Sequence, residues 1–201
     1  MDHEAGSTML YVSAILEYPQ KHPISAEEYL RMGEAGVFAP EARLELIEGE
    51  ILEMAPIGPP HSGMVARLHR LFVQRAGALA VVWGQSPVVI SDRSVPQPDL
   101  ALLKPRTDDY MGAHPRASDV FLAVEVSDAT LRFDLRTKAP PYARSGIAEL
   151  WIVDVNERTV HLFRDPANGG YRSTIATKAG EGVACLALPQ VTIDVGELFS
   201  A

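Results

Sequence analysis

A long amphipathic helix is predicted over residues 61–79, because apolar side chains recur there at intervals of three or four positions. The apolar positions are Met64, Val65, Leu68, Leu71, Phe72 and Val73. Much of the other side of this helix carries arginines, at Arg67, Arg70 and Arg75. The pattern indicates a helix with one face packed on a core and the other facing solvent.

A short helix is predicted to begin at Ser25, where the sequence has the pattern of a capping box. In this motif the Ser25 hydroxyl accepts a hydrogen bond from the Glu28 amide, and the Glu28 carboxylate reaches back to the amide of Ser25. The helix is expected to run to about Met32 and to end near Gly33.

Residues 131–145 are also predicted to be helical, although Pro140 and Pro141 lie inside this stretch. Proline removes an amide donor and crowds the preceding turn of a helix. A kink or a fresh helix start is therefore expected at these two positions.

Strands are predicted where aliphatic and β-branched runs are bounded by turn residues. Residues 43–48 and 50–54 indicate a hairpin around Gly49, and the other expected strands are 80–83, 88–90, 100–103, 120–126, 150–153, 159–164, 171–176 and 191–193. The order of helices and strands predicts an α/β (α+β) fold, in which a mixed β-sheet is flanked by two main helices.

A single globular domain is expected over residues 24–201, because the 201-residue chain is 47% apolar and contains no long Pro- or Ser/Gly-rich linker. Residues 1–23 have no clear periodicity and are expected to form an irregular N-terminal arm. The chain has no apolar run near the ~20 residues that a membrane helix needs. A soluble, cytoplasmic protein is therefore expected.

The formal net charge of −8 argues against a protein that binds nucleic acid through overall positive charge. A bound metal ion brings its own positive charge, however, so an acidic protein can still approach a phosphate. Cys185 is the only cysteine, which excludes an intrachain disulfide and a thiolate-rich zinc site.

Two carboxylates are the strongest candidates for chemistry. Glu125 lies inside an apolar predicted strand, where a carboxylate is costly unless it is paired or binds a cation. Asp99 immediately precedes another predicted strand. Acids at the ends of neighbouring strands can converge on Mg²⁺, which prefers oxygen ligands. Each acid is also compatible with an ordinary structural role at a strand end.

Four further residues are candidates with a weaker signal. Lys138 lies four residues after Asp134, and it could form a surface ion pair or stabilise negative charge in a transition state. Glu45 or Glu48 could supply a third carboxylate, and the sequence does not decide between them. His61, at the start of the long helix, could act as a base or as an outer hydrogen-bond donor.

These residues occur in an order that resembles the Uma-two family of proposed restriction endonucleases, a bacterial family formerly of unknown function. The matching segments are 45–50, His61, Pro98-Asp99, 125–127, Asp134, Lys138, Tyr142 and 146–154. The resemblance covers roughly residues 25–164 and extends to the PD-(D/E)xK nuclease superfamily. It implies a restriction-endonuclease-like core with acids meeting at one edge of a mixed sheet.

The resemblance also implies roles for individual residues. Asp99 would be the aspartate of the "PD" element and Glu125 the second acid, and together they would hold Mg²⁺ or Mn²⁺. Ser127 stands where the superfamily pattern has a lysine, so that Lys138 would supply the ammonium group from the following helix. Glu45 would be the early acid. Glu48, His61 and Ser127 are kept as accessory candidates.

Metal-dependent hydrolysis of phosphodiester bonds in nucleic acid, DNA in particular, is the function that these expectations favour. A homodimer would suit double-strand cutting. Two alternatives stay open: a binding or assembly protein on an inactive nuclease scaffold, and a hydrolase of a small phosphoester. Fold resemblance alone does not separate them, because function depends on the site.

Overall fold

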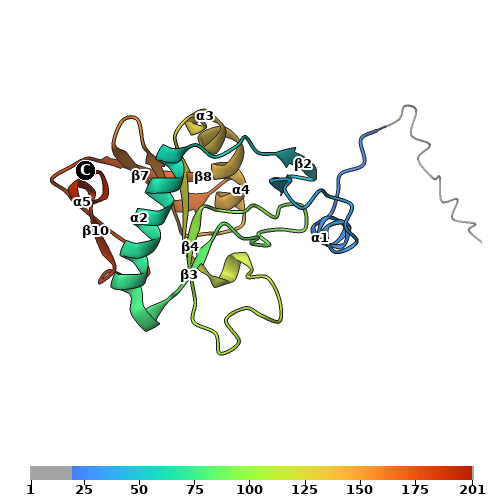
Figure 1. The fold of residues 1–201 in the computed structure, drawn as a ribbon, viewed down its shortest axis with the longest axis horizontal. Coiled ribbons are helices and arrows are strands. Elements are labelled where there is room, and N and C mark those ends of the chain that lie inside the picture. The colour runs from blue at the N-terminus through green and yellow to red at the C-terminus, as the bar shows by residue number, and fades with distance from the viewer. Residues whose placement is uncertain (1–19, 201) are drawn as a thin grey trace, which may run out of the picture.

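A six-stranded mixed sheet forms the centre of the computed structural model, which describes residues 20–200 (Figure 1). Its strand order is β3-β4-β5-β6-β7-β8. The strands are β3 (Val81–Gly84), β4 (Leu100–Leu103), β5 (Val120–Ser127), β6 (Glu149–Asp154), β7 (Thr159–Ala167) and β8 (Gly170–Thr177). Only β5 and β6 run parallel, and the other neighbours are antiparallel. The predicted mixed sheet is confirmed, and most of the expected 1–23 arm lies outside the described residues.

Helix α2 (Pro59–Ala76) covers one face of the sheet, as Figure 1 shows. Its buried side chains join those of Leu100, Leu102, Val124 and Val126 in the largest apolar cluster. The helix begins two residues earlier than predicted, because Pro59 and Pro60 suit the first turn, where amide donors have no intrahelical partner. It is followed by a short 3-10 turn, η1 (Gly77–Leu79).

The other face is covered by the helical segment that the sequence predicts at 131–145. It comprises α3 (Leu131–Phe133), a wide π turn named η3 (Asp134–Lys138) and α4 (Ala139–Arg144). In η3 the Ala139 amide donates to the Asp134 carbonyl, five residues back. Pro140 and Pro141 follow directly, and their rings crowd the carbonyls of the preceding turn. The prolines therefore widen this helical segment without ending it.

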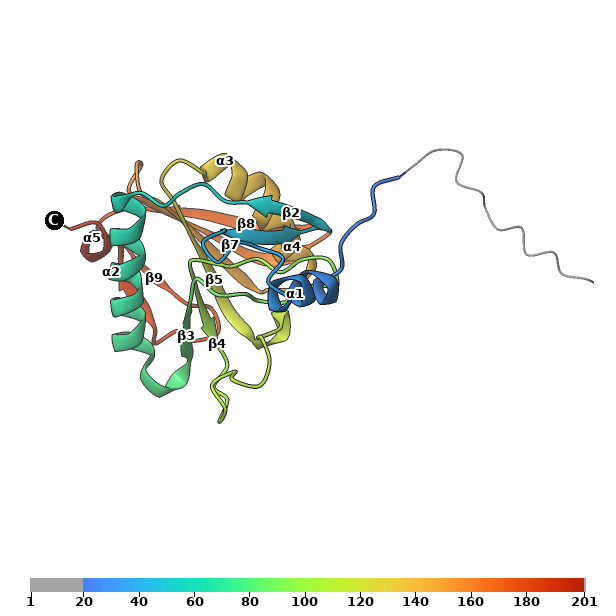
Figure 2. The ribbon, with the colours of Figure 1, turned by 45° about the vertical axis from the view of Figure 1, so that its right-hand side comes forward.

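A smaller unit consists of α1 (Ala26–Glu34) and the hairpin of β1 (Leu44–Ile47) with β2 (Glu50–Glu53). The two lie on the same side of the molecule in Figure 2. The capping box is confirmed, since the Glu28 amide donates to Ser25 Oγ and the Ser25 amide to the Glu28 carboxylate. The hairpin is joined to the rest of the chain through Leu46, which forms an antiparallel bridge with Val95.

Two strand predictions are wrong in part. Residues 88–90 form no strand, only a single bridge between Val89 and Arg116. The last predicted strand exists as β10 (Thr192–Asp194), but it pairs with β9 (Gly182–Ala184) in a separate two-stranded sheet. The sequence analysis missed β9. These segments and α5 (Val195–Leu198) pack against α2 and do not extend the main sheet.

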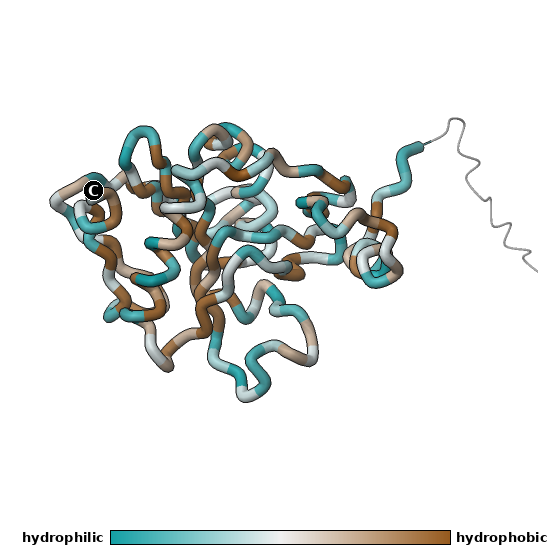
Figure 3. Tube along the Cα trace, in the orientation of Figure 1, coloured by the Kyte–Doolittle hydropathy of each residue, from teal (hydrophilic) through white to brown (hydrophobic). Residues whose placement is uncertain are grey.

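The distribution of hydropathy follows this architecture. Figure 3 shows hydrophobic colour concentrated along the central strands and hydrophilic colour on the outer loops. All four residues of β4 and all six of β6 are buried, as expected for strands covered on both faces. Within residues 20–200, no helix is both long enough and apolar enough to cross a membrane.

Candidate functional site

The strand register brings Asp99 and Glu125 together. Strands β4 and β5 are antiparallel with Leu100 opposite Val124, so the residue before β4 lies beside the end of β5. The amide of Val126 donates to Asp99 Oδ2 over 2.8 Å, which fixes the aspartate against the neighbouring strand. The two acids therefore meet at one edge of the sheet, as their positions in the sequence predict.

Glu125 points to the side of the sheet that α4 covers, because side chains alternate along β5 and those of Val124 and Val126 face α2. It is 2% exposed. Tyr142 donates its hydroxyl to Glu125 Oε1 over 2.8 Å, and Lys138 donates to Oε2 over 3.0 Å. Both oxygens of this buried carboxylate are thus held by side chains of the η3–α4 segment.

Asp99 is held by three donors from three parts of the chain. Besides the Val126 amide, His61 Nε2 lies 3.1 Å from Asp99 Oδ2, and Gln85 Nε2 donates to Oδ1 over 3.3 Å. His61 comes from the first turn of α2, while Gln85 follows β3 with a φ of 41°. This left-handed backbone is unusual for a residue other than glycine, and such strain often occurs at functional sites.

Glu45 joins the cluster from the β1–β2 hairpin. Lys138 Nζ donates to Glu45 Oε1 over 3.0 Å, the same distance as to Glu125, so its ammonium bridges the two glutamates. Lys138 and Glu45 are each 3% exposed. Among residues 20–200, Glu45 Oε2 and His61 Nδ1 have no hydrogen-bond partner although both atoms are buried.

Burial dominates the electrostatics of the cluster. It raises the pKa of Glu125 and of Glu45, and Lys138 only partly offsets this. Burial alone would lower the pKa of Lys138, but Glu125 and Glu45 together raise it above its usual value. Lys138 therefore keeps its proton, and the carboxyl groups do not all ionise easily together.

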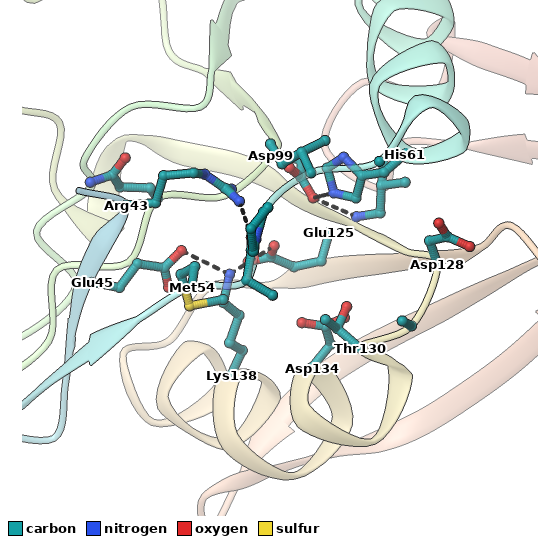
Figure 4. A pocket seen from close by; sticks show the side chains of 17 residues that line it. Arg43, Glu45, Met54, His61, Asp99, Glu125, Asp128, Thr130, Asp134 and Lys138 are labelled. Atoms are coloured by element: carbon teal, nitrogen blue, oxygen red, sulfur yellow. Dashed lines mark hydrogen bonds and ion pairs between the residues drawn. The ribbon is translucent and has the colours of Figure 1, made fainter. Parts of the chain in front are cut away.

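A pocket of about 110 Å³ opens over these side chains (Figure 4). Its charged lining consists of five carboxylates and two cations: Glu45, Asp99, Glu125, Asp128 and Asp134 against Arg43 and Lys138. Nowhere in residues 20–200 do three His, Cys, Asp or Glu side chains converge closely enough to bind a metal by themselves. Asp99 and Glu125 offer oxygen ligands of the kind that Mg²⁺ prefers, and this ion typically takes one or two protein carboxylates together with waters and substrate oxygens.

The structure separates the accessory candidates. His61 lies in the pocket against Asp99. Glu48 does not belong to the cluster, because it is exposed in the hairpin turn and pairs with Arg144. Ser127 is buried outside the pocket lining, with its hydroxyl 3.5 Å from that of Thr130.

Three residues of the site were not proposed as functional from the sequence: Tyr142, Gln85 and Arg43. Tyr142 is among the residues that carry the family resemblance, but no role was assigned to it; it lies four residues after Lys138 and so shares its face in a helix. No local sequence pattern marks Gln85 or Arg43, because their contacts in the site depend on the packing of segments that are far apart in the sequence.

The chain resembles known proteins in sequence and in fold. Residues 26–196 match the family Uma2, described as "Putative restriction endonuclease". A solved structure from Anabaena variabilis, described as a "putative nuclease belonging to DUF820", aligns with a TM-score of 0.68 at 18% sequence identity. That alignment covers 89% of this chain and 98% of the other. No protein of curated function matches the sequence.

Proposed function

The chain belongs to the Uma2 family, and from this premise we propose that it is a Mg²⁺- or Mn²⁺-dependent endonuclease. It hydrolyses phosphodiester bonds of nucleic acid, with DNA as the expected substrate. The observation that carries the proposal is the convergence of Asp99 and Glu125 in one pocket, with Lys138 Nζ 3.0 Å from Glu125.

Asp99 and Glu125 are the residues proposed to hold the metal. The unpartnered Oε2 of Glu45 makes this third acid available to the same ion or to its water shell. When bound, the metal would lower the pKa of a water molecule and polarise the phosphate. The match to the PD-(D/E)xK pattern is part of the proposal, with Asp99 as the aspartate and Glu125 as the second acid.

The surrounding side chains orient these acids. Tyr142 holds one oxygen of Glu125, while His61 and the Val126 amide hold Asp99. Lys138 uses two of its three donors on Glu45 and Glu125, which leaves one N–H for a phosphate oxygen or the attacking water. There it would stabilise the negative charge that develops on the pentavalent phosphorus.

Cleavage of supercoiled DNA in the presence of Mn²⁺ tests the proposal. Asp99→Asn and Glu125→Gln keep the shape of each side chain and remove its charge, and each is expected to abolish nicking. Glu48→Gln is the matched control, because it removes an exposed carboxylate outside the pocket. Tryptophan fluorescence checks that each variant is folded. Nicking that persists in both site variants would refute the assignment.

The main rival is a binding or assembly protein on an inactive nuclease scaffold. The net charge of −8 and the lack of a three-ligand metal cluster within residues 20–200 favour it. Calorimetric titration with Mg²⁺ and Mn²⁺ separates the two functions. Absence of binding at millimolar metal favours the rival, whereas binding that is lost in Asp99→Asn favours the nuclease.

A homodimer is part of the nuclease proposal, because cutting both strands of a duplex requires two sites. Light scattering on the purified chain measures the mass directly. A monomer at working concentration would restrict the proposed reaction to nicking or to single strands.

A further inference from the structure

The two cations that line the pocket, Lys138 and Arg43, differ in how many of their N–H donors are already hydrogen-bonded. Lys138 is buried and donates to two glutamates. Arg43 is exposed and donates Nη1 to the carbonyl of Ala55, and it makes no salt bridge with any residue in the range 20–200. A guanidinium has five N–H donors, so most of those on Arg43 remain free for a ligand.

The hairpin directs Arg43 towards the site. Arg43 immediately precedes β1, and the Met54 amide donates to its carbonyl over 2.8 Å, which continues the antiparallel pairing. Residues two apart in an extended strand share a face, so Arg43 lies on the same side as Glu45. Figure 4 shows the Arg43 side chain reaching from the hairpin towards the middle of the pocket.

The cleft continues beyond the acid cluster at Arg43. A second cavity of about 240 Å³ adjoins the first and is lined by Arg43, Glu45, Met54, Ile57, Gln85 and Gln97. All of these residues except Gln85 also line the first pocket, so Arg43 lies where the two cavities meet. The side chains of Gln85 and Gln97 are neutral polar members of this lining, and their amino groups donate to Asp99 and to the Leu44 carbonyl.

This second cavity suits a second phosphate. A phosphodiester that approaches five carboxylates needs positive charge along its path, and Arg43 is the exposed cation of the lining. Arginine can bind phosphate oxygens through two parallel N–H donors. A mononucleotide ester has a single phosphate, held at the reacting centre, and would leave Arg43 unused.

We propose that Arg43 and the adjoining cavity form a phosphate subsite for the nucleotide next to the scissile bond. The site therefore takes a polynucleotide strand in preference to a small phosphoester. The inference deepens the nuclease proposal and rests on it for the position of the scissile phosphate. The phosphate contact itself can be measured without any cleavage.

The test is fluorescence anisotropy of a labelled single-stranded oligonucleotide in buffer with Ca²⁺, repeated over a range of salt concentrations. Arg43→Ala is expected to weaken binding at least about tenfold and to reduce the slope of log K against log salt by about 0.7, the value for one phosphate on a single strand. Arg43→Lys is expected to keep the slope and to lose part of the affinity, because it keeps the charge without the planar fork. Arg31→Ala is the matched control, since Arg31 is an exposed arginine on α1 outside the pocket.

An unchanged slope in Arg43→Ala, an equal loss in Arg31→Ala, or no binding by the wild-type chain would overturn the subsite. A second measurement compares KM for an oligonucleotide with KM for the p-nitrophenyl ester of thymidine monophosphate, in Mn²⁺. Arg43→Ala is expected to raise KM more for the oligonucleotide, and an equal rise for both would overturn the inference. If the wild-type chain binds the oligonucleotide through Arg43 but cleaves neither substrate, the nuclease proposal fails, and the phosphate contact of Arg43 stands without a scissile bond beside it.

Discussion

Replacing Lys138 with methionine is expected to destabilise the metal-free protein strongly. Lys138 is 3% exposed, and its ammonium lies 3.0 Å from both Glu45 and Glu125. Methionine fills a similar volume, so the loss comes from leaving two buried carboxyl groups without their cation. Removing one partner of a buried ion pair costs about 3–5 kcal/mol.

Urea unfolding followed by tryptophan fluorescence measures this loss, since Trp151 is fully buried beneath α2. The same loss corresponds to a fall in Tm of roughly 6–20 °C for a domain of this size. Lys104→Met is the control, because Lys104 is exposed and makes no salt bridge within the described range. The control is expected to stay within about 0.5 kcal/mol of the wild type.

The double variant with Glu45→Gln shows whether the lysine acts through the glutamates. If it does, the effects of Lys138→Met and Glu45→Gln should be non-additive by about 0.5–3 kcal/mol. The reasoning fails if Lys138→Met unfolds within about 1 kcal/mol of the wild type. Simple addition of the two single effects would show that Glu45 and Lys138 are not coupled.

Three further variants or probes test other parts of the structure. Tyr142→Phe leaves an oxygen of buried Glu125 without its donor, and urea unfolding should show a loss of about 1–3 kcal/mol. Ser25→Ala removes the side-chain cap that accepts from the Glu28 amide, and thermal unfolding should show a loss of about 1 kcal/mol. Burial, followed by the influence of Glu149, raises the pKa of Cys185 to about 11, so at pH 8 only about one thiol in a thousand is ionised. Ellman's reagent should therefore label the chain only after unfolding, and rapid labelling of the native protein would contradict the buried position.

The central strands and the long helix could be predicted because their signals are local. Strand β4 and the central residues 150–153 of β6 are continuous apolar runs, which is the pattern of strands covered on both faces. The capping box at Ser25 is equally local, since both partners lie within four residues. Residues 88–90 show the limit of such local patterns: the run is apolar, and Val88 and Ile90 are buried, but Val89 forms only a single bridge, with Arg116.

The choice between Glu45 and Glu48 shows why the rest of the site could not be predicted. Side chains alternate between the two faces of a strand, so the sequence shows which residues share a face. It does not show which of the two faces another part of the chain covers. Glu48 has a φ of 53° and Gly49 a φ of 85°, so both belong to the tight turn and Glu48 leaves the strand altogether. Glu45 is buried because Lys138, 93 residues later, meets it, and no local pattern encodes that meeting.

Lys138 and Glu125 lie on different elements, η3 and β5, so the site depends on how these two elements pack together. A lysine two residues after Glu125 would share its strand and its face, and β5 alone would then set its position. Here Ser127 occupies that place, and the ammonium reaches Glu125 from η3. The distance between cation and acid is therefore set by how the π turn lies on the sheet. Because Pro140 widens that turn, a change that straightens the helical segment would move Lys138 away from Glu125 without altering either residue.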